Sequence, residues 1–138
     1  MRLGFIGTGK IAASVITGIS KSKMHSDEIL ISSRNKLISQ NLKKKFKKLV
    51  ICKDNQEIVN SCNWVFLSVT PKVGEKIIKN LKFRSNQTII SFISTINLAQ
   101  LKKAIKVKAN IVRAIPLPPI SLMKGPVPIC PPNKKVKD

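Results

Sequence analysis

Two glycines near the amino terminus are the residues of this chain best placed to bind a ligand. Gly7-x-Gly9-x-x-Ala12 follows the apolar run Leu3–Ile6 and precedes a helical pattern of apolar residues that begins at Ile11. In such an arrangement the first glycine permits a tight turn and the second lets the backbone approach a diphosphate, which then faces the amides that begin the helix. We therefore expect a dinucleotide to be bound by Gly7, Thr8, Gly9, Lys10 and Ile11.

The same stretch also partly matches a loop that binds nucleoside triphosphates. Gly4, Gly9 and Lys10 satisfy G-x-x-x-x-G-K, but Ile11 follows, where a magnesium-binding Ser or Thr is required. Gly4 also belongs to the apolar run rather than to a loop. The dinucleotide interpretation is therefore preferred, and Lys10 is left either beside the phosphates or in solvent.

The residues after the second apolar run bear on the choice of cofactor. A site for NAD usually carries an acidic residue there, which holds the ribose hydroxyls. This chain has Ser32, Ser33 and Arg34 instead, and a guanidinium with two hydroxyls suits a 2′-phosphate. The pattern favours NADP, with NAD as the alternative, unless these residues only form a polar turn.

Short apolar runs alternate with helical spacing along the chain, which is typical of a parallel sheet covered by helices. We predict strands over Leu3–Ile6, Ile29–Ile31, Leu49–Cys52, Trp64–Val69, Thr88–Ile93 and Ile111–Ile115. We predict helices over Ile11–Ile19, Leu37–Lys48, a short one capped by Asp54 and reaching Cys62, Val73–Leu81 and Leu98–Ile105. The expected fold is α/β: a Rossmann-type, doubly wound parallel sheet with helices on both faces. It forms one dinucleotide-binding domain over residues 1–138, of which 116–138 is a proline-rich, extended segment with a polar end.

The composition argues against three other classes of protein: nucleic-acid-binding, metal-binding and membrane-spanning proteins. The net charge of +20 would attract nucleic acid, but lysine is spread along the chain, and aromatic residues, which stack on bases, make up only 4%. Nucleic acid is therefore disfavoured as a partner, and we interpret Lys43–Lys45 as a solvated helix face. Three scattered cysteines and the single His25, in a loop, predict no metal site. No apolar run approaches the ~20 residues of a membrane span, so a cytoplasmic protein without a membrane partner is expected.

Beyond the glycines, the order of motifs resembles the N-terminal domain of the pyrroline-5-carboxylate reductase family. The resemblance begins with Met1–Gly9 and continues to about residue 125. It includes four further segments: Asp54-Asn55, Leu67–Pro71, Ile89–Thr95 and Val112–Pro116. It implies that Asn55 approaches the adenosine ribose. It also implies that Ser68, Val69, Thr70, Pro71 and Ser94 border the nicotinamide, and that Thr95, Pro116 and Leu117 belong to the substrate pocket.

The departures from the family pattern fall around that pocket. Thr70 replaces a lysine, Ser94-Thr95 replace Ala-Gly, and Leu117 replaces the asparagine that follows the proline. The resemblance therefore leaves open whether the substrate is pyrroline-5-carboxylate or another imine or carbonyl compound. Family members continue into a helical domain that forms the dimer. Because the chain ends at Asp138, we expect that domain to be absent, and a homo-oligomer only if such a domain exists.

The expected function is that of an NADP-dependent oxidoreductase, an imine reductase of the proline-biosynthesis type that transfers hydride from NADPH to a cyclic imine. The cofactor carries this chemistry, so the sequence assigns no general acid or base, and the catalytic residues are unknown. Two alternatives stay open. One is a non-catalytic NADP-binding module or truncated paralogue, and the other, less favoured, is a basic domain that binds nucleic acid.

Overall fold

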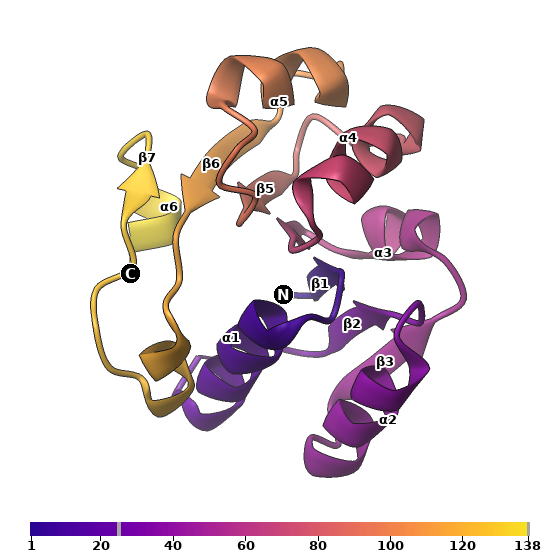
Figure 1. Cartoon of the computed structure of the whole chain (residues 1–138), viewed down its shortest axis with the longest axis vertical. Helices are drawn as coiled ribbons and strands as arrows, with labels where there is room; N and C mark the ends of the chain where they lie inside the picture. The colour runs from indigo at the N-terminus through magenta and orange to yellow at the C-terminus, as the bar shows by residue number, and fades with distance from the viewer. Residues whose placement is uncertain (25, 138) are drawn as a thin grey trace.

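The computed structural model of the chain describes residues 1–24 and 26–137, and in it a seven-stranded sheet runs through the molecule (Figure 1). The strand order is β3-β2-β1-β4-β5-β6-β7, and the first six strands are parallel. The strands are β1 (Leu3–Ile6), β2 (Ile29–Ser32), β3 (Leu49–Cys52), β4 (Trp64–Leu67), β5 (Thr88–Ser91), β6 (Asn110–Ala114) and β7 (Ile129–Cys130). Because the chain winds outward first from β1 and then from β4, the predicted doubly wound Rossmann sheet is confirmed.

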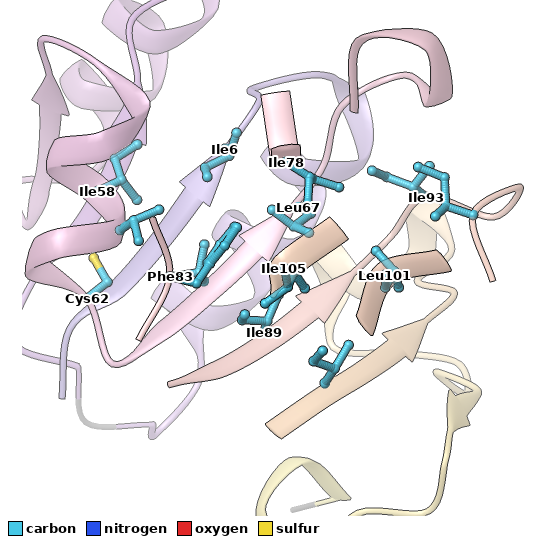
Figure 2. Close-up of a cluster of buried hydrophobic side chains, with 14 of the residues drawn as sticks. Ile6, Ile58, Cys62, Leu67, Ile78, Phe83, Ile89, Ile93, Leu101 and Ile105 are labelled. Carbon is cyan, nitrogen blue, oxygen red and sulfur yellow. The ribbon is translucent and has the colours of Figure 1, made fainter. Parts of the chain in front are cut away.

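Helices cover both faces of the sheet, as predicted. They are α1 (Lys10–Lys21), α2 (Lys36–Lys45), α3 (Asn55–Ser61), α4 (Pro71–Asn80), α5 (Leu98–Ile105), the 3₁₀ helix η1 (Pro118–Leu122) and α6 (Lys134–Lys137). Figure 1 shows α1 and α2 grouped apart from α3, α4 and α5. Neighbouring strand residues point to opposite faces, so Phe5 packs in the core beneath α1 and α2, whereas Ile6 packs in the core beneath α3–α5 (Figure 2).

Helices α1 to α4 differ from the sequence prediction by one to three residues at their ends, and three of these differences have a clear local reason. Helix α2 ends at Lys45, not Lys48, because Phe46 is extended at φ −128°. Helix α4 begins at Pro71, two residues before the predicted Val73, because proline is well suited to the first helical position. Helix α3 ends at Ser61, and the predicted last residue, Cys62, is its C-cap. The Asp54 cap is confirmed, since its carboxylate accepts the Glu57 N–H at 2.8 Å.

The prediction that residues 116–138 are simply extended is wrong for three short elements. Helix η1 packs against α1 at Gly18, where a Cβ would lie only 2.4 Å from the Ile120 carbonyl oxygen. Strand β7 then pairs antiparallel with β6, and α6 lies within the part predicted as a polar tail. The proline pattern does not reveal these contacts, because η1 and β7 are held by α1 and β6, which are distant from them in the sequence. His25 and Asp138, on which two expectations fell, lie outside the described residues.

Candidate functional site

An open cleft lies at the carboxyl ends of β1 and β2, beside the point where the winding of the sheet reverses. Its volume of ≈ 500 Å³ lies within the range of about 300–1,000 Å³ that is typical of pockets for small ligands. Six residues line it: Gly7, Thr8, Gly9, Arg34, Asn35 and Lys36. Open α/β sheets bind ligands at this position, because the strand ends and helix amino termini converge there. The structure therefore brings the glycine turn together with Arg34.

Gly7 holds the floor of this cleft in a conformation that other residues rarely adopt. Its φ is +97°, and a Cβ on it would lie 2.1 Å from the backbone oxygen of Ser68. Its N–H donates a hydrogen bond of 2.9 Å to the hydroxyl oxygen of Ser32. The turn is therefore packed between the ends of β2 and β4, with no room for a side chain at Gly7.

Gly9, in contrast to Gly7, has open space where a side chain would be. It is the N-cap of α1 at φ −69°, and nothing lies within 4 Å of a Cβ built on it. No side chain caps the helix, and no acidic residue lies in its first turn, so the first amide donors of α1 have no intrahelical partner. The hydroxyl of Thr8 is buried without a hydrogen-bond partner. Open space beside unpaired donors fits the diphosphate of a dinucleotide.

The residues after β2 divide into buried and cleft-lining groups. Ser32 is only 3% exposed, and its hydroxyl oxygen is engaged by Gly7. The Ser33 hydroxyl donates a long bond of 3.4 Å to the Lys53 carbonyl, away from the glycine turn. Arg34 is exposed and lines the cleft. Of the three residues expected at a 2′-phosphate, Arg34 alone lies in the cleft wall.

Sequence reasoning missed two cleft residues, Asn35 and Lys36. Asn35 caps α2 by accepting the Ile38 N–H at 3.2 Å, which fixes the start of that helix in the cleft wall. Lys36 is the first residue of α2 and adds a second cation beside Arg34. A signal was available, since Asn followed by an amphipathic run marks a helix start, and helix starts at this edge face ligands. No acidic residue lines the cleft.

The remaining predicted cofactor residues differ in their exposure to solvent. Lys10 is exposed and Ile11 half-buried at the start of α1, and Asn55 is half-buried as the first residue of α3. Asn55 does not line the cleft itself. At the end of β4, the Ser68 N–H donates to the Ile6 carbonyl at 2.8 Å, and a Cβ on Gly7 would lie 2.8 Å from the Val69 side chain. The β4–α4 loop therefore adjoins the glycine turn.

The β4–α4 loop continues into exposed residues that could face a ligand. Thr70 is the N-cap of α4, but its side chain makes no capping hydrogen bond, and Pro71 is the first helical residue. Both are exposed, as are Ser94 and Thr95 after β5. These segments lie at the carboxyl ends of adjacent parallel strands, so they occupy the same edge of the sheet as the cleft.

The predicted pocket residues Pro116 and Leu117 have different surroundings. Pro116 is buried and lines an apolar hollow of ≈ 490 Å³ with Trp64, Phe66 and Phe92, on the face that α1 and the C-terminal segment cover. Leu117 is 50% exposed. The structure does not bring these two residues into one pocket with Thr95.

Burial controls the chemistry of two cysteines. It raises the pKa of the Cys52 thiol to about 11 and that of the Cys62 thiol to about 12, with smaller contributions from nearby carboxylates at Cys52. Both groups therefore stay protonated near neutral pH and are poor nucleophiles.

Over residues 1–24 and 26–137, no three His, Cys, Asp or Glu side chains gather as metal ligands, and no helix has the length and apolarity to cross a membrane.

A glycine turn at the switch point of a doubly wound sheet defines a Rossmann-type nucleotide-binding domain. Comparison with known proteins assigns the family. The chain belongs to the family described as "NADP oxidoreductase coenzyme F420-dependent", whose profile matches residues 2–97. Fold and family together place it in an NAD(P)-binding oxidoreductase family, and the chain is similar to pyrroline-5-carboxylate reductases.

Its curated relatives carry that name. The chain is 28% identical over 130 residues to "Pyrroline-5-carboxylate reductase 3" of Danio rerio, covering 91% of this chain and 44% of the relative. It is 26% identical over 126 residues to the pyrroline-5-carboxylate reductase of a Synechocystis strain, covering 91% and 47%. The chain thus spans about half the length of the curated relatives it matches.

Solved structures agree on the fold. The pyrroline carboxylate reductase of Plasmodium falciparum, crystallised with NADP, superposes with a TM-score of 0.82 at 21% identity, covering 98% of this chain and 50% of that one. The enzyme of Streptococcus pyogenes gives 0.77 at 23% identity, covering 98% and 51%.

Proposed function

We propose that this protein is an NADP-dependent reductase that delivers hydride from NADPH to the carbon of a C=N bond in a cyclic imine, as in proline biosynthesis. The observation that carries the proposal is the cleft in which two cations, Arg34 and Lys36, face the glycine turn without any acidic residue. The names of the curated relatives support the choice of substrate class. Another imine or carbonyl compound is the alternative substrate.

In this proposal, each part of the sheet edge has its own role. The free amides of α1 and the open space at Gly9 receive the diphosphate, while Arg34 and Lys36 bind the 2′-phosphate. Asn55 contacts the adenosine ribose. The residues that follow β4 and β5 border the nicotinamide: the half-buried Ser68 and Val69 and the exposed Thr70, Pro71 and Ser94.

When bound, the nicotinamide supplies the hydride, and the chain's own contribution is to bind and orient. A protonated imine accepts hydride at carbon without a strong acid, so no side chain here needs to supply a proton during that step. Thr95 is the proposed substrate contact from this chain, whereas Pro116 and Leu117 lie outside the pocket that contains it. A C-terminal domain, if the protein has one, would complete the pocket and form a homo-oligomer.

Titration with NADPH and NADH, followed by nicotinamide fluorescence, tests the cofactor half of this proposal. We expect saturable binding with a lower Kd for NADPH, and no binding of either nucleotide would reject the whole proposal. Turnover of pyrroline-5-carboxylate, followed as loss of NADPH absorbance, tests the catalytic half. Tight binding without turnover of any imine would reject catalysis and favour a binding module.

A further inference from the structure

A dense cluster of lysines lies at the amino edge of the sheet, opposite the cofactor cleft. Helices α1 and α2 both end at this edge, and the loops that follow them lead into β2 and β3. The exposed lysines of these segments are Lys21, Lys23, Lys43, Lys44, Lys45, Lys47 and Lys48. Lys43–Lys45, predicted to form a solvated helix face, therefore belong to a larger basic cluster that two neighbouring helix ends build together.

These segments border a hollow of ≈ 410 Å³, which we call the lysine hollow. Its lining contains charged, hydroxyl-bearing and apolar side chains: Lys23, Lys45, Lys47 and Lys48; Ser20, Ser22 and Ser26; Ile19, Met24, Ile29 and Phe46. Among the residues that the structure describes, no carboxylate lines it. The volume is that of a pocket for a small ligand, so the lining offers several cations to one compact molecule.

Hydrogen bonds hold one of these cations in place. The Nζ of Lys48 donates a partly buried bond of 3.1 Å to the Ser26 carbonyl, which joins the loop before β3 to the loop before β2. The Lys48 carbonyl in turn accepts the Ile29 N–H at 3.1 Å. A lysine ammonium has three N–H donors, so Lys48 keeps two of them for a ligand at a position that the backbone fixes.

The positive charge of the cluster is not balanced by acidic side chains. The loop before β2 carries Asp27 and Glu28, but Asp27 pairs with the Met1 amino group and Glu28 pairs with Arg2 at 3.2 Å. Across residues 1–24 and 26–137, no lysine forms an ion pair. Like charges held close together repel one another. An anion with several charges would relieve that repulsion at all the lysines it contacts.

We infer that the lysine hollow binds an anion carrying two or more phosphate groups, either a soluble oligophosphate or the headgroup of a phosphorylated lipid. Lysine ammonium groups bind phosphate oxygens through charge-assisted hydrogen bonds. The apolar walls at Ile19, Met24 and Phe46 suit the organic body that carries the phosphates. The site is separate from the cofactor cleft, so the inference goes beyond the proposed function and does not depend on it.

Two other roles compete with this one. A solvated surface would attract loose counterions without a defined stoichiometry. Nucleic acid would also be attracted by the charge, but the described lining has no arginine to read base edges, and its one aromatic ring, Phe46, is half-buried. A concave hollow suits a compact anion better than a long duplex.

Calorimetric titration of the full chain with sodium tripolyphosphate tests the inference. At a salt concentration of about 0.15 M, charges farther apart than about 8 Å are largely screened, which suppresses loose counterion binding. We expect a saturable site, and we expect the triple variant Lys23→Gln, Lys45→Gln, Lys47→Gln to raise its Kd by about 10-fold or more. The three side chains are exposed, so thermal unfolding should stay unchanged.

A second triple variant controls for net charge. Lys79→Gln, Lys102→Gln, Lys103→Gln removes three exposed lysines from the last turns of α4 and α5. It should change the Kd for tripolyphosphate by less than about 3-fold, because those charges are screened from the lysine hollow. Arg34→Ala should also leave this Kd unchanged, which separates the site from the cofactor cleft.

Three results would overturn the inference. Binding that does not saturate, or equal weakening by the two triple variants, would leave the cluster a solvated surface. Loss of tripolyphosphate binding in Arg34→Ala alone would place the anion in the cofactor cleft. Duplex DNA that binds through the same lysines while tripolyphosphate does not would assign the cluster to nucleic acid.

Sedimentation with phosphatidylcholine vesicles, with and without phosphatidylinositol bisphosphate, distinguishes the two sources of the phosphate groups. Sedimentation that requires the phosphorylated lipid, is competed by tripolyphosphate and is lost in the Lys23, Lys45, Lys47 variant would support the lipid headgroup. Saturable tripolyphosphate binding without such sedimentation would support a soluble oligophosphate.

Discussion

The backbone N–H of Gly7 donates a 2.9 Å hydrogen bond to the hydroxyl of Ser32, which joins the glycine turn to the end of β2. This bond changes the role of a residue that the sequence placed beside the phosphate. Ser32 is almost wholly buried, so its hydroxyl supports the turn from within. The support acts on the part of the site that any dinucleotide shares.

Ser32→Ala should therefore weaken NADPH and NADH to the same extent. The variant leaves the partly buried N–H of Gly7 unpaired, at a cost of about 1 kcal/mol to the free energy of unfolding. Urea denaturation measures that loss, and fluorescence titration measures the two Kd values. A selective loss of NADPH would instead show that the hydroxyl recognises the 2′-phosphate.

Arg34→Ala should weaken NADPH selectively and leave stability unchanged, because Arg34 is exposed in the cleft wall and packs against no core. We expect the Kd for NADPH to rise by about 10- to 100-fold, with little change for NADH or for unfolding. Lys44→Ala, which removes an exposed charge near the other end of α2, serves as the control for net charge. Similar losses for both nucleotides would remove Arg34 from 2′-phosphate recognition.

Substitutions at the two glycines of the turn should have different effects, one mainly on binding and the other mainly on folding. Gly9→Ala places a methyl group in open space at an ordinary φ of −69°, so its unfolding free energy should change by less than about 1 kcal/mol while dinucleotide binding weakens. Gly7→Ala forces a Cβ into the Ser68 carbonyl at φ +97° and should cost ~3 kcal/mol or more. Calorimetric unfolding combined with NADPH titration checks both, and full affinity in Gly9→Ala would contradict the diphosphate position.

Thiol titration should distinguish the cysteines by burial. Cys52 and Cys62 are buried, with their thiol pKa values raised to about 11 and about 12, whereas Cys130 is exposed. A disulfide reagent at pH 8 should therefore react quickly with Cys130 alone, and with all three thiols in denaturant. The same shifts make folding stability pH-dependent. Their contribution is constant below the unfolded thiol pKa of about 8.5 and falls as pH rises toward 11. Rapid reaction of Cys62 in the folded chain would contradict its burial.

Much of this architecture could be predicted from local pattern. The run Leu3–Ile6, the glycines after it and the helical spacing from Ile11 are consecutive in the chain, so their order alone predicts a strand, a turn and a helix. Every strand that the apolar runs predicted is present, although the runs at Trp64 and Thr88 overshoot by two residues each. Apolar residues continue past the last ladder bond there, because the following loop is itself partly buried.

The candidate site, like the fold, was predicted from the sequence only in part. The chain's own residue types predicted that a turn suited to a diphosphate follows β1, since only small residues allow that approach, and that an arginine without an acidic neighbour follows β2. Which of the polar residues after β2 reaches the cleft was decided in three dimensions. Ser32 turns inward to Gly7, Ser33 turns toward Lys53, and Lys36 joins Arg34 only because α2 begins at the cleft wall. Burial of Arg113 beneath Ser94, and of Pro116 beside Trp64, likewise depends on partners far away in sequence, and no periodicity within one segment encodes such contacts.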